Sequence, residues 1–255
     1  MLRWPSRRPR VPRVLAQPVS EAFSLSAPLN PAATLNQVTK LFGRFAALRE
    51  VSAVFYPARL YAVLGENGAG KTTLLRVIAG LTKPTKGDVS LPSTEAALNR
   101  QAIGYMAHAS LLYDELNGLE NLRYFAGLYG IRNARHCENL MRRVGLDPGL
   151  TRRVGDYSQG MKQRLSLARA IVHDPKIVLF DEPFSNLDSA SAQDIAGLLA
   201  GMRSSGKCVL VVTHQAGLLK DLADESLLLT QGQLTARAQG VAADWSIENF
   251  QKGSA

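Results

Sequence analysis

The apolar positions of the chain divide it into strand-like runs and amphipathic helical stretches. Two runs, 34–42 and 51–57, are rich in apolar and β-branched residues and flank a turn at Gly43. The apolar run 61–65 predicts a buried strand. Residues 72–81 follow closely, and their apolar side chains recur at the i, i+3, i+4 spacing of a helix. The pattern therefore predicts a strand, a loop and a helix in direct succession.

The second half of the chain changes character twice. Residues 108–155 contain helical pieces and no clear strand, which predicts a helical insertion. Beyond it, 176–180 and 207–213 are short β-branched runs separated by a helical stretch, as in a parallel sheet with crossover helices. Residues 225–236 predict a closing hairpin. We therefore predict an α/β fold with a parallel sheet and an inserted helical subdomain.

Composition is consistent with this picture. A chain of 255 residues with 46% hydrophobic content can bury a full core, as one domain or as one domain with an insertion. Much of the net charge of +9 lies near the N-terminus, where five arginines precede the first acidic residue, Glu21. The rest is only mildly basic, so we expect no nucleic-acid surface. Cys137 and Cys208 lack metal-ligand spacing and give no disulfide framework, which fits a reducing cytoplasm.

The two ends of the chain are expected to lie outside the folded domain, which we place at 34–240. Residues 1–33 contain six prolines, which exclude a regular helix or the apolar core of a signal peptide. We predict a disordered tail there, which is a loose extension, a misassigned start, a basic arm for anionic lipids or a transit-like address. We also predict a C-terminal extension over 241–255. No run approaches the roughly 18 apolar residues of a membrane-spanning helix, so action at a membrane requires a partner.

The strongest motif is GENGAGKTT at 65–73, which fits the pattern G-x-x-x-x-G-K-[ST]. Its loop opens a helix, so its backbone N–H groups can wrap phosphates at a helix N-terminus. Lys71 adds a charge, the Thr72 hydroxyl is placed to bind Mg²⁺, and Thr73 can reach the α-phosphate. The expected nucleotide contacts from this loop are Gly65, Glu66, Asn67, Gly68, Ala69, Gly70, Lys71, Thr72 and Thr73.

Two carboxylates follow the buried run 177–180. The strand would bring Asp181 to the sheet edge, where it can hold the Mg²⁺ shell through water, while Glu182 faces the other way and can polarise an attacking water. A salt-bridged pair at a strand end is the alternative. His214 ends the next strand and is a candidate γ-phosphate sensor, or an ordinary polar terminator. We predict Glu182, His214 and Lys71 as the catalytic residues.

A second anion-binding feature is the stretch YSQGMKQRLSLARA at 157–170, in which Ser158 can cap a helix. Together these motifs resemble the ATP-binding-cassette family of ATPases over about 34–234. The resemblance implies a P-loop NTPase core, an N-terminal antiparallel β subdomain and a helical subdomain inserted at about 108–165. It also implies that two cassettes pair head to tail, so that Ser158, Gln159 and Gly160 grip the γ-phosphate bound by the partner. Tyr157, Gln159 and Met161 replace the family's commoner Leu, Gly and Gln.

Three further positions take roles from the resemblance. Phe42 stands where the family places an aromatic ring on adenine, and Asp188, in 185–188, belongs to the segment that crosses the dimer interface. His108 occupies the switch position where the family usually has a Gln that touches Mg²⁺ and water and senses the membrane partner. For His108 we also expect a fall in ATPase activity at mildly acid pH. The alternatives are a core residue for Phe42, a surface acid for Asp188 and a hinge residue for His108.

Within the family, the runs 111–130, 157–175 and 181–188 look most like the heme-exporter ATPase of cytochrome c maturation. The ATPase of another exporter, for drugs, polysaccharides, lipids or sodium, and a soluble non-transport cassette are the alternatives. The resemblance implies ATP and Mg²⁺ as cofactors, integral membrane subunits and a second ATPase copy as partners. It also implies a peripheral location on the cytoplasmic face of the inner membrane.

Overall fold

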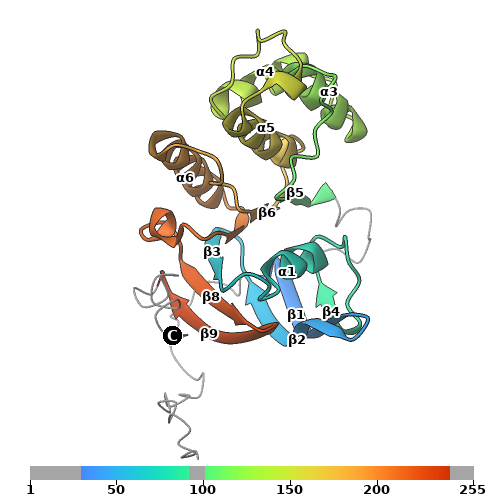
Figure 1. The fold of residues 1–255 in the computed structure, drawn as a ribbon, viewed down its shortest axis with the longest axis vertical. Coiled ribbons are helices and arrows are strands. Elements are labelled where there is room, and N and C mark those ends of the chain that lie inside the picture. The colour runs from blue at the N-terminus through green and yellow to red at the C-terminus, as the bar shows by residue number, and fades with distance from the viewer. Residues whose placement is uncertain (1–29, 92–100, 242–255) are drawn as a thin grey trace, which may run out of the picture.

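The computed structural model describes residues 30–91 and 101–241 (Figure 1). Its first sheet is antiparallel, with the strand order β2-β1-β4. These strands are β1 (Ala33–Phe42), β2 (Phe45–Phe55) and β4 (Lys86–Ser90). The two predicted strands around Gly43 are thus confirmed, and β2 begins earlier than the predicted strand at 51–57.

Among the residues that the structure describes, the second sheet has six strands in the order β5-β6-β7-β3-β8-β9. Neighbouring strands from β5 to β8 are parallel, and β9 pairs with β8 in an antiparallel hairpin, as predicted. The strands are β3 (Arg59–Leu64), β5 (Ile103–Met106), β6 (Ile177–Asp181), β7 (Cys208–Val212), β8 (Glu225–Thr230) and β9 (Gln233–Gln239). Because β3, β6 and β7 are central, their side chains are buried on both faces, which explains their continuous apolar runs.

The helices fall into two groups. Helix α1 (Lys71–Ile78) and helix α6 (Ser189–Ser204) flank the six-stranded sheet. Three α-helices come between β5 and β6 and gather at one end of the molecule, where the last of them packs against β5 and β6 (Figure 1). They are α3 (Gly118–Leu128), α4 (Ala134–Arg143) and α5 (Gln159–Ile171). This arrangement confirms the predicted α/β fold with a helical insertion.

The core lies on both faces of the parallel sheet. Leu60, Ala62 and Leu64 of β3 belong to the cluster that continues into the helical subdomain. Tyr61 and Val63 point the other way, into the cluster shared with α1 and the antiparallel sheet. This alternation follows from the period of two along a strand. Packing on both faces holds the sheet rigidly between two layers and fixes the positions at which its strands end.

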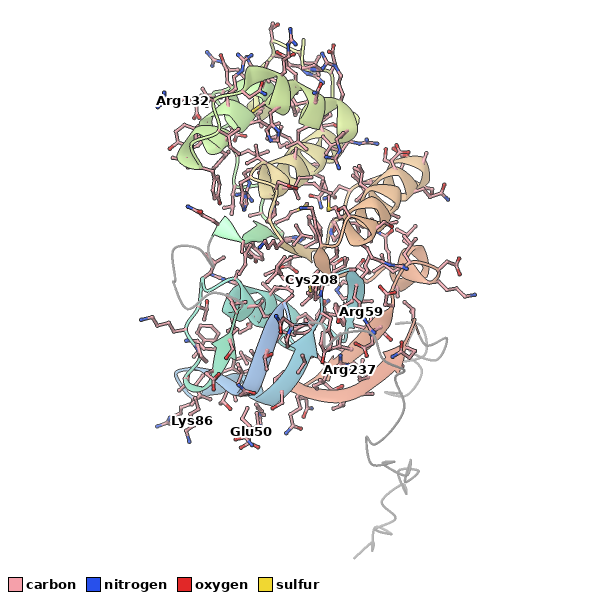
Figure 2. All side chains as sticks on the ribbon, turned by 180° about the vertical axis from the view of Figure 1, so that it is seen from behind. Glu50, Arg59, Lys86, Arg132, Cys208 and Arg237 are labelled. Carbon is pink, nitrogen blue, oxygen red and sulfur yellow. The ribbon has the colours of Figure 1, made fainter. Side chains whose placement is uncertain are left out.

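Charged side chains mark the two ends of the molecule. Figure 2 shows Glu50 and Lys86 at the edge of the antiparallel sheet and Arg132 at the far end of the helical subdomain, all three exposed. No helix within the described ranges is long and apolar enough to cross a bilayer. The predicted tail up to residue 29 and the predicted extension from 242 lie outside the described residues. Ala33 already belongs to β1, where it pairs with Phe55.

Candidate functional site

The loop between β3 and α1 depends on two glycines. Gly65 (φ 144°) and Gly70 (φ 103°) adopt backbone angles that other residues avoid. A Cβ at Gly65 would collide with the carbonyl oxygen of Leu229, and one at Gly70 would collide with that of Ala47. The loop is therefore pressed against β8 and β2. Its backbone N–H groups are held at the start of α1, which has no side-chain cap and so leaves donors free for an anion.

Lys71 is the first residue of α1, and its side chain is buried, with only 7% of its surface exposed. Its ammonium donates to the carbonyl oxygens of Gly65 at 2.7 Å and Glu66 at 2.8 Å. Burial lowers the pKa of Lys71, and the nearby carboxylates of Glu182 and Asp181 oppose this shift. Since an ammonium has three donors, two fix its position and one remains for an incoming oxygen.

Asp181 ends β6 opposite this loop. It is only 2% exposed, and its Oδ2 atom is buried without a hydrogen-bond partner among the described residues. Burial raises the pKa of Asp181, and the hydroxyl of Thr72 and the ammonium of Lys71 oppose the shift. An unpartnered buried carboxylate oxygen is costly unless a hydrogen-bond donor or a cation satisfies it. Because Mg²⁺ prefers oxygen ligands, the Asp181 carboxylate and the Thr72 hydroxyl fit this ion.

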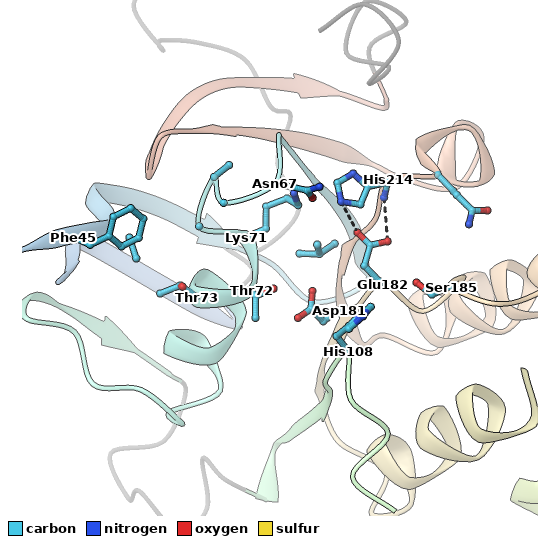
Figure 3. Close-up of a pocket in the computed structure, with 16 residues that line it drawn as sticks. Phe45, Asn67, Lys71, Thr72, Thr73, His108, Asp181, Glu182, Ser185 and His214 are labelled. Atoms are coloured by element: carbon cyan, nitrogen blue, oxygen red, sulfur yellow. Dashed lines mark hydrogen bonds and ion pairs between the residues drawn. The ribbon is translucent and has the colours of Figure 1, made fainter. Parts of the chain in front are cut away.

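Glu182 and His214 form a fixed pair beside Asp181 (Figure 3). Glu182 Oε2 accepts a hydrogen bond from the His214 backbone N–H at 3.2 Å, and Glu182 Oε1 lies 3.3 Å from the ring Nε2. Burial raises the pKa of Glu182, and the hydrogen bond from His214 opposes that rise. A carboxylate with a raised pKa, held in one orientation, is suited to accept a proton.

These groups surround one pocket of about 600 Å³, here called the α1 pocket. The predicted residues that line it are Asn67, Gly68, Ala69, Gly70, Lys71, Thr72, Thr73, His108, Asp181, Glu182 and His214. Gly65 and Glu66 take part only through their carbonyl oxygens, which hold Lys71. His108 reaches the pocket from the segment that follows β5, near Asp181 (Figure 3).

The aromatic residue at this pocket is not the predicted one. Phe42 does not line the pocket; its ring is 53% exposed, and the ammonium of Lys40 lies 5.0 Å from the ring centroid. Phe45, its partner across the hairpin, lines the pocket instead, at the end opposite Glu182 (Figure 3). The turn at Gly43 places the two rings at different positions, so the pocket's aromatic wall comes from the start of β2.

The remaining predicted residues gather in a second pocket of about 410 Å³, the α5 pocket. It is lined by Ser158, Gln159 and Gly160 at the start of α5 and by Asp188 at the start of α6. Ser158 Oγ accepts from the N–H of Met161 at 3.3 Å, and Asp188 Oδ1 accepts from that of Ser191 at 2.8 Å. This last bond keeps the pKa of Asp188 below its usual range. Two helix N-termini thus converge on one exposed surface.

Comparison with known proteins identifies the family. Residues 48–185 match the family model described as ABC transporter. The chain belongs to this family. The ABC transporter ATP-binding protein NatA of Bacillus subtilis is 35% identical to this cassette over 201 residues, 75% of this chain and 81% of NatA. The probable multidrug ABC transporter ATP-binding protein YbhF of Escherichia coli is 34% identical over 185 residues, 70% of this chain and 32% of YbhF.

Solved structures give the same result for the fold. A dimeric ATP-binding cassette in a post-hydrolysis state, bound to ADP and Pi, aligns with a TM-score of 0.74 and 25% identity. The alignment covers 82% of this chain and 99% of that chain. The ATP-binding subunit of another ABC transporter aligns with a TM-score of 0.75 and 26% identity, over 88% of this chain and 95% of the other. This cassette is therefore an ATP-binding subunit of an ABC transporter, and it is an ATPase.

Two features of the cassette were missed in the sequence. Phe45 carries no pattern that separates it from Phe42. Gln163 of α5 donates from Nε2 to the carbonyl oxygen of Glu182 at 2.7 Å, and it is only 8% exposed. A signal for Gln163 did exist, because it shares the buried face of α5 with Ser166 and Ala170, at helical spacing. A polar side chain in such a stripe needs a buried partner.

Proposed function

We propose that this cassette is the ATP-hydrolysing subunit of an export complex, in which two copies pair head to tail and drive a membrane partner. One observation carries the proposal. The anion-binding groups of the chain are divided between two pockets: the α1 pocket also contains the buried carboxylates of Asp181 and Glu182, whereas the exposed α5 pocket contains the start of α5 and Asp188. In a head-to-tail pair, the α5 pocket of each copy completes the α1 pocket of the other.

In the α1 pocket, the first N–H groups of α1 and the free donor of Lys71 would bind the phosphates of ATP. Thr72 and Asp181 would hold Mg²⁺, which neutralises phosphate charge when bound. The unpartnered Oδ2 of Asp181 supports this assignment. Phe45, at the far end of the pocket, is the aromatic residue available to the adenine, in place of Phe42.

Hydrolysis would proceed by attack of a water oxygen on the γ-phosphorus. A bond forms between these two atoms, the bond from phosphorus to the bridging oxygen of ADP breaks, and the proton of the water passes to Glu182. The contacts of His214 with both oxygens of Glu182 support this role, because they fix the direction from which the base can act. His214 would also stabilise the charge that develops on the γ-phosphate.

The α5 pocket would take the γ-phosphate of the ATP bound by the partner copy. Ser158, Gln159 and Gly160 stand at the N-terminus of a helix of 13 residues, where the dipole favours an anion. Asp188, the last residue of 185–188, caps α6 beside this pocket. In the pair, segment 185–188 would therefore cross the interface between the two active sites. Closure of the pair then depends on the nucleotide, which binds the closed state more tightly than the open one.

The membrane partner would dock on the cleft between α1 and the helical subdomain. This cleft, of about 470 Å³, is lined by Leu81, Tyr105, Phe125 and Tyr129 among others. Leu81 is 60% exposed and Tyr129 41%, and exposed apolar side chains of this size often mark a protein interface. Strand β5 joins the cleft to His108, so a partner seated there would contact the segment that reaches the nucleotide. The cassette would then lie on the cytoplasmic face of the inner membrane.

For the cargo, we propose heme export of the cytochrome c maturation type, because the runs 111–130, 157–175 and 181–188 resemble that subfamily. A drug exporter is the second candidate, since YbhF is described as a probable multidrug transporter protein. The deciding experiment isolates the full chain with its membrane partners and measures covalent c-type heme attachment in cells that lack the cassette. Unchanged heme attachment would overturn the heme proposal. Failure of any membrane protein to co-purify after crosslinking would overturn the transport complex itself.

A further inference from the structure

The backbone of Glu182 is held in an unusual conformation. Its φ angle of 56° lies in the left-handed region, which residues with a Cβ seldom adopt. Such a conformation persists only where the surrounding contacts impose it. The direction of the Glu182 side chain therefore depends on the bonds that hold its peptide groups.

Three hydrogen bonds hold these groups. The Glu182 N–H donates to the carbonyl of Val212 at 2.9 Å, and the Glu182 carbonyl accepts from the Ser185 N–H at 3.2 Å. The same carbonyl accepts from Nε2 of Gln163 at 2.7 Å, the shortest of the three. The first bond comes from β7 and the second from the local turn. The bond from Gln163 alone among these three ties Glu182 to the helical subdomain.

The helix that carries Gln163 also contacts the segment that follows Glu182. A Cβ at Gly160 would touch the carbonyl oxygen of Asn186 at 3.4 Å, so the start of α5 lies directly on this segment. Arg164, next to Gln163, donates from Nη2 to the Ser191 hydroxyl at 2.7 Å. Helix α5 thus contacts both ends of 182–191, at Glu182 and at the start of α6.

We propose that Gln163 is a positioning residue for Glu182, so that the direction of the carboxylate depends on where α5 is seated. The inference rests on the proposed function, in which Glu182 accepts the proton and the start of α5 binds the ATP of the partner copy. Gln163 lies five positions after Ser158, about 7.5 Å along the helix axis. A shift of α5 on nucleotide binding would therefore move the donor that holds Glu182, and each ATP would help to set the base of the other site.

The test compares single and double variants of the full chain in Mg²⁺-dependent ATP hydrolysis. Gln163→Met keeps the length of the side chain and removes the donor, and Gln163→Glu replaces it with an acceptor that repels the carbonyl. We expect kcat to fall about tenfold in Gln163→Met and further in Gln163→Glu, with KM for ATP unchanged, because a small displacement of a catalytic group slows chemistry without weakening binding. Glu182→Gln is measured in parallel.

A matched control removes an equally buried hydrogen bond elsewhere. Tyr61→Phe deletes the bond from the Tyr56 N–H to the Tyr61 hydroxyl at 2.8 Å, at a side chain with no exposed surface. We expect its kcat to stay near the parental value. If this control slowed hydrolysis as much as Gln163→Met, the effect would be a general loss of packing and the proposal would fail.

The double variant separates positioning from a purely structural role. When Glu182→Gln has already removed the base, adding Gln163→Met should cost almost nothing more, because both act through the same group. A further tenfold loss in the double variant would overturn the proposal, as would a parental kcat in Gln163→Met. If Glu182→Gln itself hydrolysed ATP at the parental rate, the proposed function would fail first.

Discussion

The α1 pocket and the α5 pocket handle charge in opposite ways. In the α1 pocket, Lys71 and Asp181 are 7% and 2% exposed. Burial lowers the pKa of Lys71 and raises that of Asp181, and both shifts favour the neutral form of the side chain. In the α5 pocket, Ser158 and Asp188 are exposed, and each already caps its own helix. The first pocket contains charges that lack full compensation, whereas the second contains groups that are satisfied without a ligand.

Because of this difference, the two pockets should bind phosphate groups with different strength. Buried charges interact strongly with a ligand because little water screens them. Capping groups at an exposed helix start interact weakly on their own and gain strength only when a second surface excludes water. We therefore expect the α1 pocket to bind ATP in a single copy and the α5 pocket to act only in a pair. Variants of Glu182, Lys71, Ser158 and His108 test this difference between the pockets.

The largest effect is expected for Glu182→Gln, which keeps the shape of the side chain and removes the base. Loss of a general base typically slows a reaction by about 10²–10⁴-fold. ATP should still bind, so the variant should retain unhydrolysed nucleotide, and single-turnover hydrolysis with nucleotide binding measured in parallel checks both. Glu50→Gln, at the exposed edge of the antiparallel sheet, removes the same charge elsewhere and should leave the rate unchanged. Parental turnover in Glu182→Gln would assign the base to another group.

The next effect concerns binding to a single copy. Lys71→Ala removes the buried ammonium and leaves the carbonyls of Gly65 and Glu66 without their donor. A hydrogen bond to a charged group contributes about 1.5–3 kcal/mol, so ATP affinity should fall about 10- to 100-fold. Calorimetric titration with ATP measures the change, with the exposed Lys86→Ala as the matched control. An unchanged dissociation constant would show that the loop amides bind the phosphates without this side chain.

The α1 pocket could be predicted from sequence because its parts are local. The glycine spacing of 65–73 encodes the loop, and the apolar run 177–180 brings Asp181 to the sheet edge. Both signals depend only on neighbours in the chain, and the structure places them as expected. The hairpin of β8 and β9 is equally local, because its turn residues and apolar runs lie within 225–236.

Most of the missed features depend on contacts between distant segments, and one depends on the register of a hairpin. Strand β4 is mostly exposed and lacks an apolar pattern, and pairing with β1 is what makes it a strand. The contact of Gln163 with Glu182 requires α5 to pack on the end of β6, which no local pattern encodes. Phe42 and Phe45 are distinguished only by the register of the hairpin between β1 and β2. Strand order in the six-stranded sheet is likewise a property of the assembled fold.

The third effect tests whether the α5 pocket acts only in a pair of cassettes. Ser158→Arg places a bulky side chain at the start of α5 and should weaken ATP-dependent pairing about tenfold or more, while ATP binding to the single copy stays unchanged. Light scattering in the Glu182→Gln background with ATP measures pairing. Ser204→Arg, at the exposed end of α6, adds the same charge without touching either pocket. A parental dimer in Ser158→Arg would show that the α5 pocket does not face the partner's nucleotide.

The smallest effect is expected at His108, on the segment that would link the α1 pocket to the membrane partner. His108 is exposed and lines the α1 pocket, so His108→Gln should change kcat at neutral pH by about threefold or less, the value of one modest hydrogen bond.

The dependence of the ATPase rate on pH tests the role of His108 more sharply. Burial raises the pKa of Glu182, so as the pH falls the base is protonated, and becomes inactive, at a higher pH than an ordinary Glu. An imidazole also loses its acceptor nitrogen on protonation, whereas a Gln amide keeps its acceptor. We therefore expect the acid limb of the ATPase profile to remain in His108→Gln but to move to lower pH. The profiles are measured in the complex with the membrane partner. An identical limb in both proteins would leave Glu182 as the sole cause of the limb and His108 as a hinge residue.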